Sequence, residues 1–161
     1  MLYAGLVRSC TEKQGAHVAP NATQFSRNSD LTGLWSGEYW YAGAANPVPF
    51  SAHIVDTAGN LTGTTLEPNT FAHPGLIELS AGIEGARGEL SVRFTKIYHA
   101  APGVRRDPIF YSGAVDAAFT MIDGQWIYAD GNTSGRFVLV RVSRGAQAEA
   151  VERQAELELK R

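Results

Sequence analysis

Between residues 31 and 143, apolar positions recur with the two-residue period of β-strands, and no helical period interrupts them. The clearest case is the segment 76–84, where every second residue from Ile77 to Ile83 is apolar and Glu, Ser or Gly stands between. Such alternation is typical of a strand with one face in a core and the other in solvent. The pattern therefore predicts an all-β protein.

Turn residues divide this region into eight predicted strands. They cover 34–41, 48–56, 61–67, 76–84, 89–98, 109–116, 119–128 and 136–142. The connections between consecutive strands are short enough for an antiparallel meander. Such a meander predicts a closed up-and-down β-barrel, just wide enough inside for one small ligand. A two-sheet sandwich is the alternative, but it usually needs longer crossing connections.

The two ends of the chain have a different composition from this β region. Residues 1–30 are rich in Asn, Ser, Thr and Gln, which predicts a flexible N-terminal arm. Residues 144–161 consist largely of Ala, Glu, Gln, Leu and Arg, with opposite charges four residues apart, and predict a short C-terminal helix. The predicted organisation is an arm over 1–30, a barrel over 31–143 and a helix over 144–161.

The first predicted strand opens on Gly33-Leu34-Trp35, and Arg141 lies in the last one. In these residues the chain resembles the calycin superfamily of β-barrels, which includes lipocalins, fatty-acid-binding proteins and avidins. The resemblance implies that Trp35 fills one end of the barrel and that Arg141 stacks across its ring, a cation–π contact that closes this end. It is closest to the avidins, in the segments LTGLW at 31–35 and GNLTGT at 59–64.

Two departures from the avidin pattern concern the ligand. Avidins carry a biotin-binding Asn two residues after the Trp, where this chain has Gly37, and a ligand-binding Tyr where it has Thr65. We therefore expect the scaffold of that family without its biotin site.

Candidate ligand-binding residues follow from the alternation of the strands. If Trp35 points inward, Tyr39 and Tyr41 do so as well, and Lys96 and Tyr98 share a face with Leu90, Val92 and Phe94. The complete set of candidates is aromatic or cationic: Tyr39, Tyr41, Lys96, Tyr98, Tyr111 and Trp126. In the alternative interpretation Lys96 and Tyr98 lie at a solvated strand end, and the aromatic residues are ordinary core.

Charge and composition exclude several function classes. The formal net charge is −2 without a basic stretch, which gives no electrostatic case for binding nucleic acid or an anionic membrane. The single cysteine, Cys10, excludes an internal disulfide and a cysteine-based zinc site. The four histidines lie in separate segments, and neither a nucleophile elbow nor a phosphate-binding loop occurs. We therefore predict no metal, no cofactor and no catalytic residue.

The compartment is predicted from the N-terminal residues. No apolar run is long enough for a transmembrane helix, and the start of the chain lacks a good secretory leader, so we expect a cytoplasmic protein. Residues 7–10 faintly resemble a lipoprotein cleavage site, which makes a lipoprotein or a secreted protein the alternative if the N-terminus is truncated.

The functional prediction is a non-enzymatic barrel that binds a small apolar or aromatic ligand in its interior. One alternative is a cofactor-free cyclase, isomerase or decarboxylase with Lys96 and Tyr98 as the acid/base or electrostatic pair. Both side chains inside a closed pocket, with no carboxylate neutralising Lys96, would favour this alternative, and both at the rim would exclude it. Another is a filled barrel that serves as an assembly module.

The outer face of the last predicted strand bears on the oligomeric state. Residues 137–140 are apolar on both faces, which predicts that the outer surface there is covered. We expect a homodimer or higher homo-oligomer to provide the cover, with the C-terminal helix as the second choice.

Overall fold

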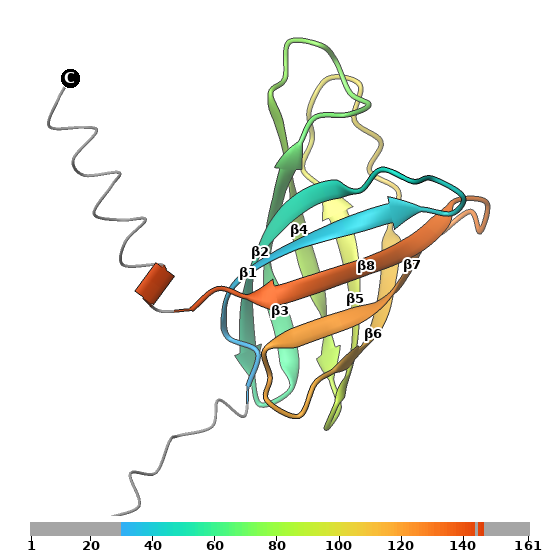
Figure 1. Cartoon of the computed structure of the whole chain (residues 1–161). Helices are drawn as coiled ribbons and strands as arrows, with labels where there is room; N and C mark the ends of the chain where they lie inside the picture. Colours follow the sequence, from blue (N-terminus) through green and yellow to red (C-terminus); the bar gives the residue numbers. More distant parts are fainter. Residues whose placement is uncertain (1–29, 144, 147–161) are drawn as a thin grey trace, which may run out of the picture.

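The computed structural model describes residues 30–143, 145 and 146, and residues 33–141 form a closed antiparallel barrel in meander order (Figure 1). Its strands are β1 (Gly33–Tyr41), β2 (Val48–Thr57), β3 (Asn60–Pro68), β4 (Glu78–Arg87), β5 (Ser91–Tyr98), β6 (Ile109–Val115), β7 (Met121–Tyr128) and β8 (Ser134–Arg141). The barrel closes because β8 pairs with β1, with Arg141 opposite Trp35. This closure confirms the predicted fold class and rules out a two-sheet sandwich.

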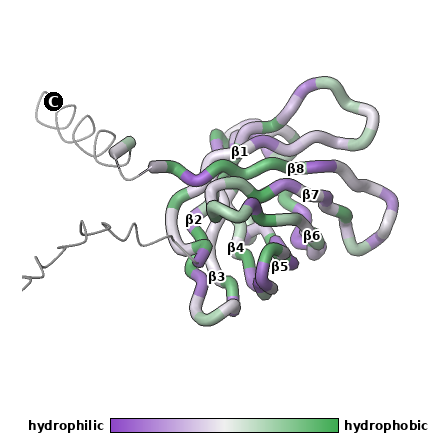
Figure 2. Tube along the Cα trace, turned by 60° about the horizontal axis from the view of Figure 1, so that its bottom comes forward, coloured by the Kyte–Doolittle hydropathy of each residue, from purple (hydrophilic) through white to green (hydrophobic). Residues whose placement is uncertain are grey.

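The core occupies the barrel interior and is formed by every second residue of each strand. In β2, for example, Phe50, Ala52 and Ile54 are buried while the residues between them are exposed. Figure 2 shows the resulting alternation of apolar and polar residues along the strands. The wall is thus apolar on its inner side, as the two-residue period predicts.

The predicted boundaries of four strands, β4, β5, β7 and β8, are wrong by two or three residues. β4 begins at Glu78 and continues to Arg87, through residues predicted as a turn, so Ile77 lies outside the strand and is 87% exposed. β5 begins at Ser91, so Leu90 is exposed and does not share the inner face of that strand. These ends were misplaced because apolar residues in the flanking loops continued the alternation.

The start of β7 is set by a side chain in the preceding turn. The Asp116 carboxylate accepts hydrogen bonds from the backbone amides of Thr120 and Met121, at 2.6 and 2.8 Å. Phe119, predicted as the first residue of this strand, lies in the turn with a φ of 57°. An Asp side chain that bonds the following backbone favours a turn over a strand.

Glycines occupy inward-facing positions where neighbouring strands approach closely. A Cβ atom at Gly135 would lie 1.8 Å from the carbonyl oxygen of Trp40, and one at Gly124 would lie 2.1 Å from that of Ser112. Only glycine permits these approaches. A Cβ atom at Gly124 would also lie 2.9 Å from Cε1 of Phe137, so large rings occupy the space that these glycines leave inside the barrel.

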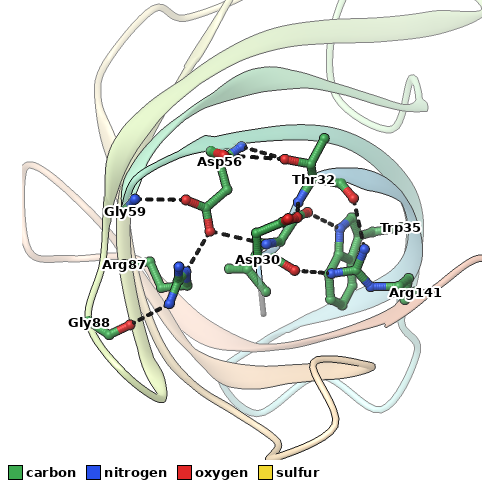
Figure 3. Close-up of polar contacts among 9 residues, drawn as sticks. Asp30, Thr32, Trp35, Asp56, Gly59, Arg87, Gly88 and Arg141 are labelled. Atoms are coloured by element: carbon green, nitrogen blue, oxygen red, sulfur yellow. Dashed lines mark hydrogen bonds and ion pairs between the residues drawn. The ribbon is translucent and has the colours of Figure 1, made fainter. Parts of the chain in front are cut away.

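One end of the barrel, called the closed end, is sealed around Trp35 (Figure 3). The Arg141 guanidinium lies 4.7 Å from the centroid of the Trp35 ring, and the Trp35 indole N–H donates to the carbonyl of Leu31 at 3.0 Å. Arg141 also donates to the carbonyls of Asp30 and Thr32, at 2.5 and 2.8 Å. The structure thus brings together the two residues that the calycin resemblance pairs.

An ion pair completes the closed end. Arg87 Nε lies 2.5 Å from Asp56 Oδ2, and the Asp56 carboxylate also accepts the amides of Leu31 and Gly59 (Figure 3). Burial acts to raise the pKa of Asp56, but the hydrogen bond from Arg87 and those from the two amides outweigh it and lower the pKa. These contacts tie the segment before β1 to strands β2 and β4.

Two predicted segments lie outside the described residues: the N-terminal arm, apart from Asp30, and the C-terminal helix, apart from residues 145 and 146. No helix in the described part of the chain is long and apolar enough to cross a membrane. On the outer face, Ile127 and Val140 are 40% and 50% exposed in this single chain. The homo-oligomer that these residues suggested stays a prediction.

Candidate ligand-binding site inside the barrel

The interior carries an ion pair near the end opposite Trp35, called the loop end. Glu67 is the second-last residue of β3, and Lys96 lies two residues before the end of β5. Both point inward from strands that are separated by β4. Glu67 is 2% exposed and Lys96 is 1% exposed. Lys96 Nζ lies 2.5 Å from Glu67 Oε2, which places a cation and a carboxylate in contact within an apolar core.

Two phenols complete this ion pair. Tyr98 donates its hydroxyl hydrogen to Glu67 Oε1, and Tyr39 donates to the same oxygen at 3.3 Å. Lys96 Nζ in turn donates to the Tyr98 hydroxyl oxygen at 3.2 Å. Both carboxylate oxygens of Glu67 therefore have partners, as the burial of a charge requires.

Burial shifts the proton affinities of the groups around Glu67. It lowers the pKa of Lys96 more strongly than the Glu67 charge raises it, although the pair is in contact. Burial, followed by the negative charge of Glu67, raises the pKa values of Tyr98 and Tyr39 far above the usual phenol range. At neutral pH both phenols consequently hold their protons and act as donors toward Glu67.

Aromatic rings surround the ammonium group. Lys96 Nζ lies 4.5 Å from the ring centroid of Tyr98, 5.7 Å from that of Tyr39 and 5.9 Å from that of Phe50. Such contacts stabilise a desolvated cation through the negative faces of the rings.

The structure brings the six predicted ligand-binding residues to this part of the interior. Tyr39 and Tyr41 each make an edge contact with Trp126, at centroid distances of 5.9 and 5.1 Å. The Tyr111 ring is stacked on Phe94 with the ring centroids 4.8 Å apart. Burial, followed by the negative charge of Glu67, raises the pKa of Tyr111. Lys96 and Tyr98 face inward, so the alternative that placed them at a solvated strand end is wrong.

Glu67 was missed by the sequence analysis, which treated it only as the end of a strand. A signal was present, because the alternation from Leu61 through Thr65 places Glu67 on the inner face of β3. An inward-facing lysine needs a counter-charge inside the barrel, so an inward-facing Lys96 would have indicated Glu67 as its partner.

Two buried polar atoms of this interior have no hydrogen-bond partner among the described residues. They are Trp126 Nε1 on β7 and Thr65 Oγ1 on β3. Buried indole N–H and hydroxyl groups normally have a partner, and leaving one unpaired costs about 1–3 kcal/mol. These atoms are therefore available to hydrogen-bond a ligand or water in the barrel.

Two loops cover the loop end and project together from the barrel at the top of Figure 1. They span residues 69–77, between β3 and β4, and 99–108, between β5 and β6. The His73 amide of the first donates to the Pro102 carbonyl of the second at 3.3 Å, and the Phe71 ring packs edge-on against Tyr98 at 5.5 Å. The loops thus lie directly above the Glu67 network.

The contacts of the described residues bear on two sequence-based expectations, the alternative of an enzyme and the absence of a metal site. Glu67 forms an ion pair with Lys96, so the structure does not show the unneutralised lysine that would favour the enzyme alternative. Among residues 30–143, 145 and 146, no three His, Cys, Asp or Glu side chains are grouped so as to hold a metal ion.

In comparisons with known proteins, no protein-family model and no curated protein sequence matches this chain. The class that the structure shows is that of the eight-stranded antiparallel β-barrels.

Proposed function

We propose that this protein is a non-enzymatic binding protein that takes a small aromatic ligand with one polar group into the loop end of its barrel. The observation that carries the proposal is the buried Lys96–Glu67 pair beside the unpartnered N–H of Trp126. The resemblance to the calycin superfamily agrees with it, since a barrel closed at one end by Trp35 and Arg141 leaves the other end for a ligand.

The ion pair supports a binding role because stability alone does not require it. Replacing a buried ion pair by apolar side chains of similar volume is often neutral or stabilising. An interior that keeps Glu67 and Lys96 among aromatic rings therefore retains groups that can recognise the polar part of a ligand.

The proposed ligand has its rings against Tyr41 and Trp126 and its acceptor at the indole N–H of Trp126. The side chains of Tyr41 and Tyr128 are half-buried at this end and can turn to admit a ring. Entry also requires loops 69–77 and 99–108 to part, which breaks the hydrogen bond between His73 and Pro102.

Native mass spectrometry of the purified protein, compared with its denatured mass, is the first test. We expect an additional mass of small-molecule size that is retained only under native conditions. In a second measurement, calorimetry with 2-naphthol as the probe should show binding to the unmodified chain.

Two variants test whether 2-naphthol binds inside the barrel or on its outer surface. Trp126→Phe keeps an aromatic ring but removes the N–H, and should weaken 2-naphthol binding about three- to tenfold. Thr62→Val removes a hydroxyl from an exposed residue of β3, on the outer face of the wall, and should leave the affinity unchanged. A protein that retains no small molecule and binds 2-naphthol equally well in all three forms would not be the binding protein proposed here.

A further inference from the structure

A hollow of about 760 Å³ lies on the outer face of the barrel, and its lining includes Tyr41, Tyr111 and Trp126, whose side chains pack in the interior on the other side of the wall. It crosses β4 to β8 and the end of β1, and its lining includes Gly85 and Gly135, where neighbouring strands approach too closely for a Cβ atom. Its volume is in the range of small-molecule sites. The outer wall thus has a concave surface large enough for a small molecule.

The floor of this hollow carries a row of outward-facing side chains in register across five strands. From β1 to β5 the row reads Trp40, Arg136, Gln125, Ser112 and Arg93. Adjacent strands lie about 4.8 Å apart, so the backbones of the two arginines are roughly 14 Å apart. Two cations thus lie on either side of neutral hydrogen-bonding groups.

An apolar pair lies beside this row. Phe110 and Ile127 are opposite each other on β6 and β7, and they are 47% and 40% exposed. A ring placed on these two side chains would cover apolar surface that this chain leaves in water.

The charged groups of the hollow favour an anion. Arg93, Arg136 and Glu84 are the charged residues among its described lining, which leaves a net charge of +1. None of the three forms an ion pair with another described residue. Arg136 lies 4.2 Å from the Trp40 ring centroid, and a guanidinium stacked on a ring keeps its N–H edge available for a carboxylate.

The surroundings of the hollow limit the size of that anion. The next outward-facing positions toward the closed end include Glu38 on β1 and Asp123 on β7, both exposed. These carboxylates would repel a polyanion that extended beyond the hollow. The charge pattern thus fits a compact ligand with a single negative charge.

We infer that the outer hollow is a second binding site, for a planar organic monoanion such as an aromatic carboxylate. The carboxylate bonds to Arg136, with Arg93 adding attraction from the other side, and the ring lies on Phe110 and Ile127. This inference does not rest on the function proposed for the interior, although the two sites share the wall at Tyr41, Tyr111 and Trp126.

The test is a titration of the full chain with 1-naphthoate, followed by nuclear magnetic resonance of the backbone amides. Shifts are expected at Ser112, Gln125 and Gly135. Uncharged 1-naphthalenemethanol is the matched ligand, and it should bind about tenfold or more weakly at this face.

Charge-removing variants identify the site. Arg136→Gln should weaken 1-naphthoate binding about tenfold and Arg93→Gln by a smaller factor, both less so at high salt. Arg105→Gln removes an exposed arginine outside the hollow and should change nothing. The inference is overturned if the neutral ligand binds equally well or if neither hollow variant weakens the affinity. It is also overturned if only Trp126→Phe weakens it, because the anion would then bind inside the barrel.

Discussion

Replacing a single residue is expected to change the stability of this protein most where a charge is buried, as at Glu67. Its two carboxylate oxygens take hydrogen bonds from Lys96, Tyr98 and Tyr39. Removing either member of the ion pair leaves the other buried without its counter-charge, which typically costs 3–5 kcal/mol. Removing both at once does not leave a charge behind.

We therefore predict strong coupling between Glu67→Leu and Lys96→Met in a double-mutant cycle. Each single variant should lower the free energy of unfolding by about 3–5 kcal/mol, and the double variant should lose much less than the sum. Chemical denaturation of the four proteins measures this. Losses that simply add would mean that the two groups do not interact as the structure describes.

The double variant also separates stability from binding. If the ion pair recognises a ligand, a folded Glu67→Leu/Lys96→Met protein should lose most of its affinity for 2-naphthol. Unchanged affinity in that protein would remove the ion pair from the binding site while leaving the fold intact.

At the scale of elements, the shape of the barrel depends on glycines inside strands. Gly135 lies opposite Trp126 in the β7–β8 pairing and near the Trp40 carbonyl of β1. A methyl group there would contact both the backbone of one strand and the indole of another. The backbone cannot move aside without disrupting the β1–β8 ladder that closes the barrel.

Gly135→Ala should consequently destabilise the protein by about 1–3 kcal/mol or more. Gly82→Ala is the matched control, because a Cβ at Gly82 in β4 would meet only the His99 ring, at 3.8 Å. That variant should change the unfolding free energy little or raise it slightly, since alanine restricts the unfolded chain more than glycine. Thermal unfolding of both proteins compares them, and equal melting temperatures would contradict the close approach of β1 and β8.

For the whole molecule, the interior makes the fold sensitive to alkaline pH. Burial is the largest cause that raises the pKa of Tyr39, Tyr41, Tyr98, Tyr111 and Tyr128, the last to about 12. A phenol whose pKa in the folded state lies above its unfolded value of 10.0 does not lower the free energy of unfolding at a pH below 10.0. As the pH rises above it, the unfolded chain releases protons that the folded barrel retains, so stability falls.

We expect alkaline unfolding to be cooperative and to coincide with ionisation of these five tyrosines. Tyrosinate absorbance and far-ultraviolet circular dichroism should change together as the pH is raised. Below that transition, these five tyrosines should remain protonated in the folded barrel. Full ionisation of these phenols with the β-signal intact would show that they are accessible in the folded state.

The sequence by itself determined the number and order of the strands and the residues that face inward. Alternation is a local property of extended chain, so residues such as Tyr39, Lys96 and Trp126 could be placed on the inner face without knowing their neighbours. Strand ends were less certain where loop residues such as Ile77 and Leu90 continued the apolar pattern.

Only the tertiary structure decided which inward residues meet. Glu67 and Lys96 come together across β4 because the closed wall curves, and no pattern within β3 or β5 encodes that distance. The outer hollow likewise requires the close strand approaches at Gly85 and Gly135, which depend on how the whole sheet coils as it closes. Local periodicity fixes the direction of a side chain, whereas its partners are fixed by the geometry of the closed barrel.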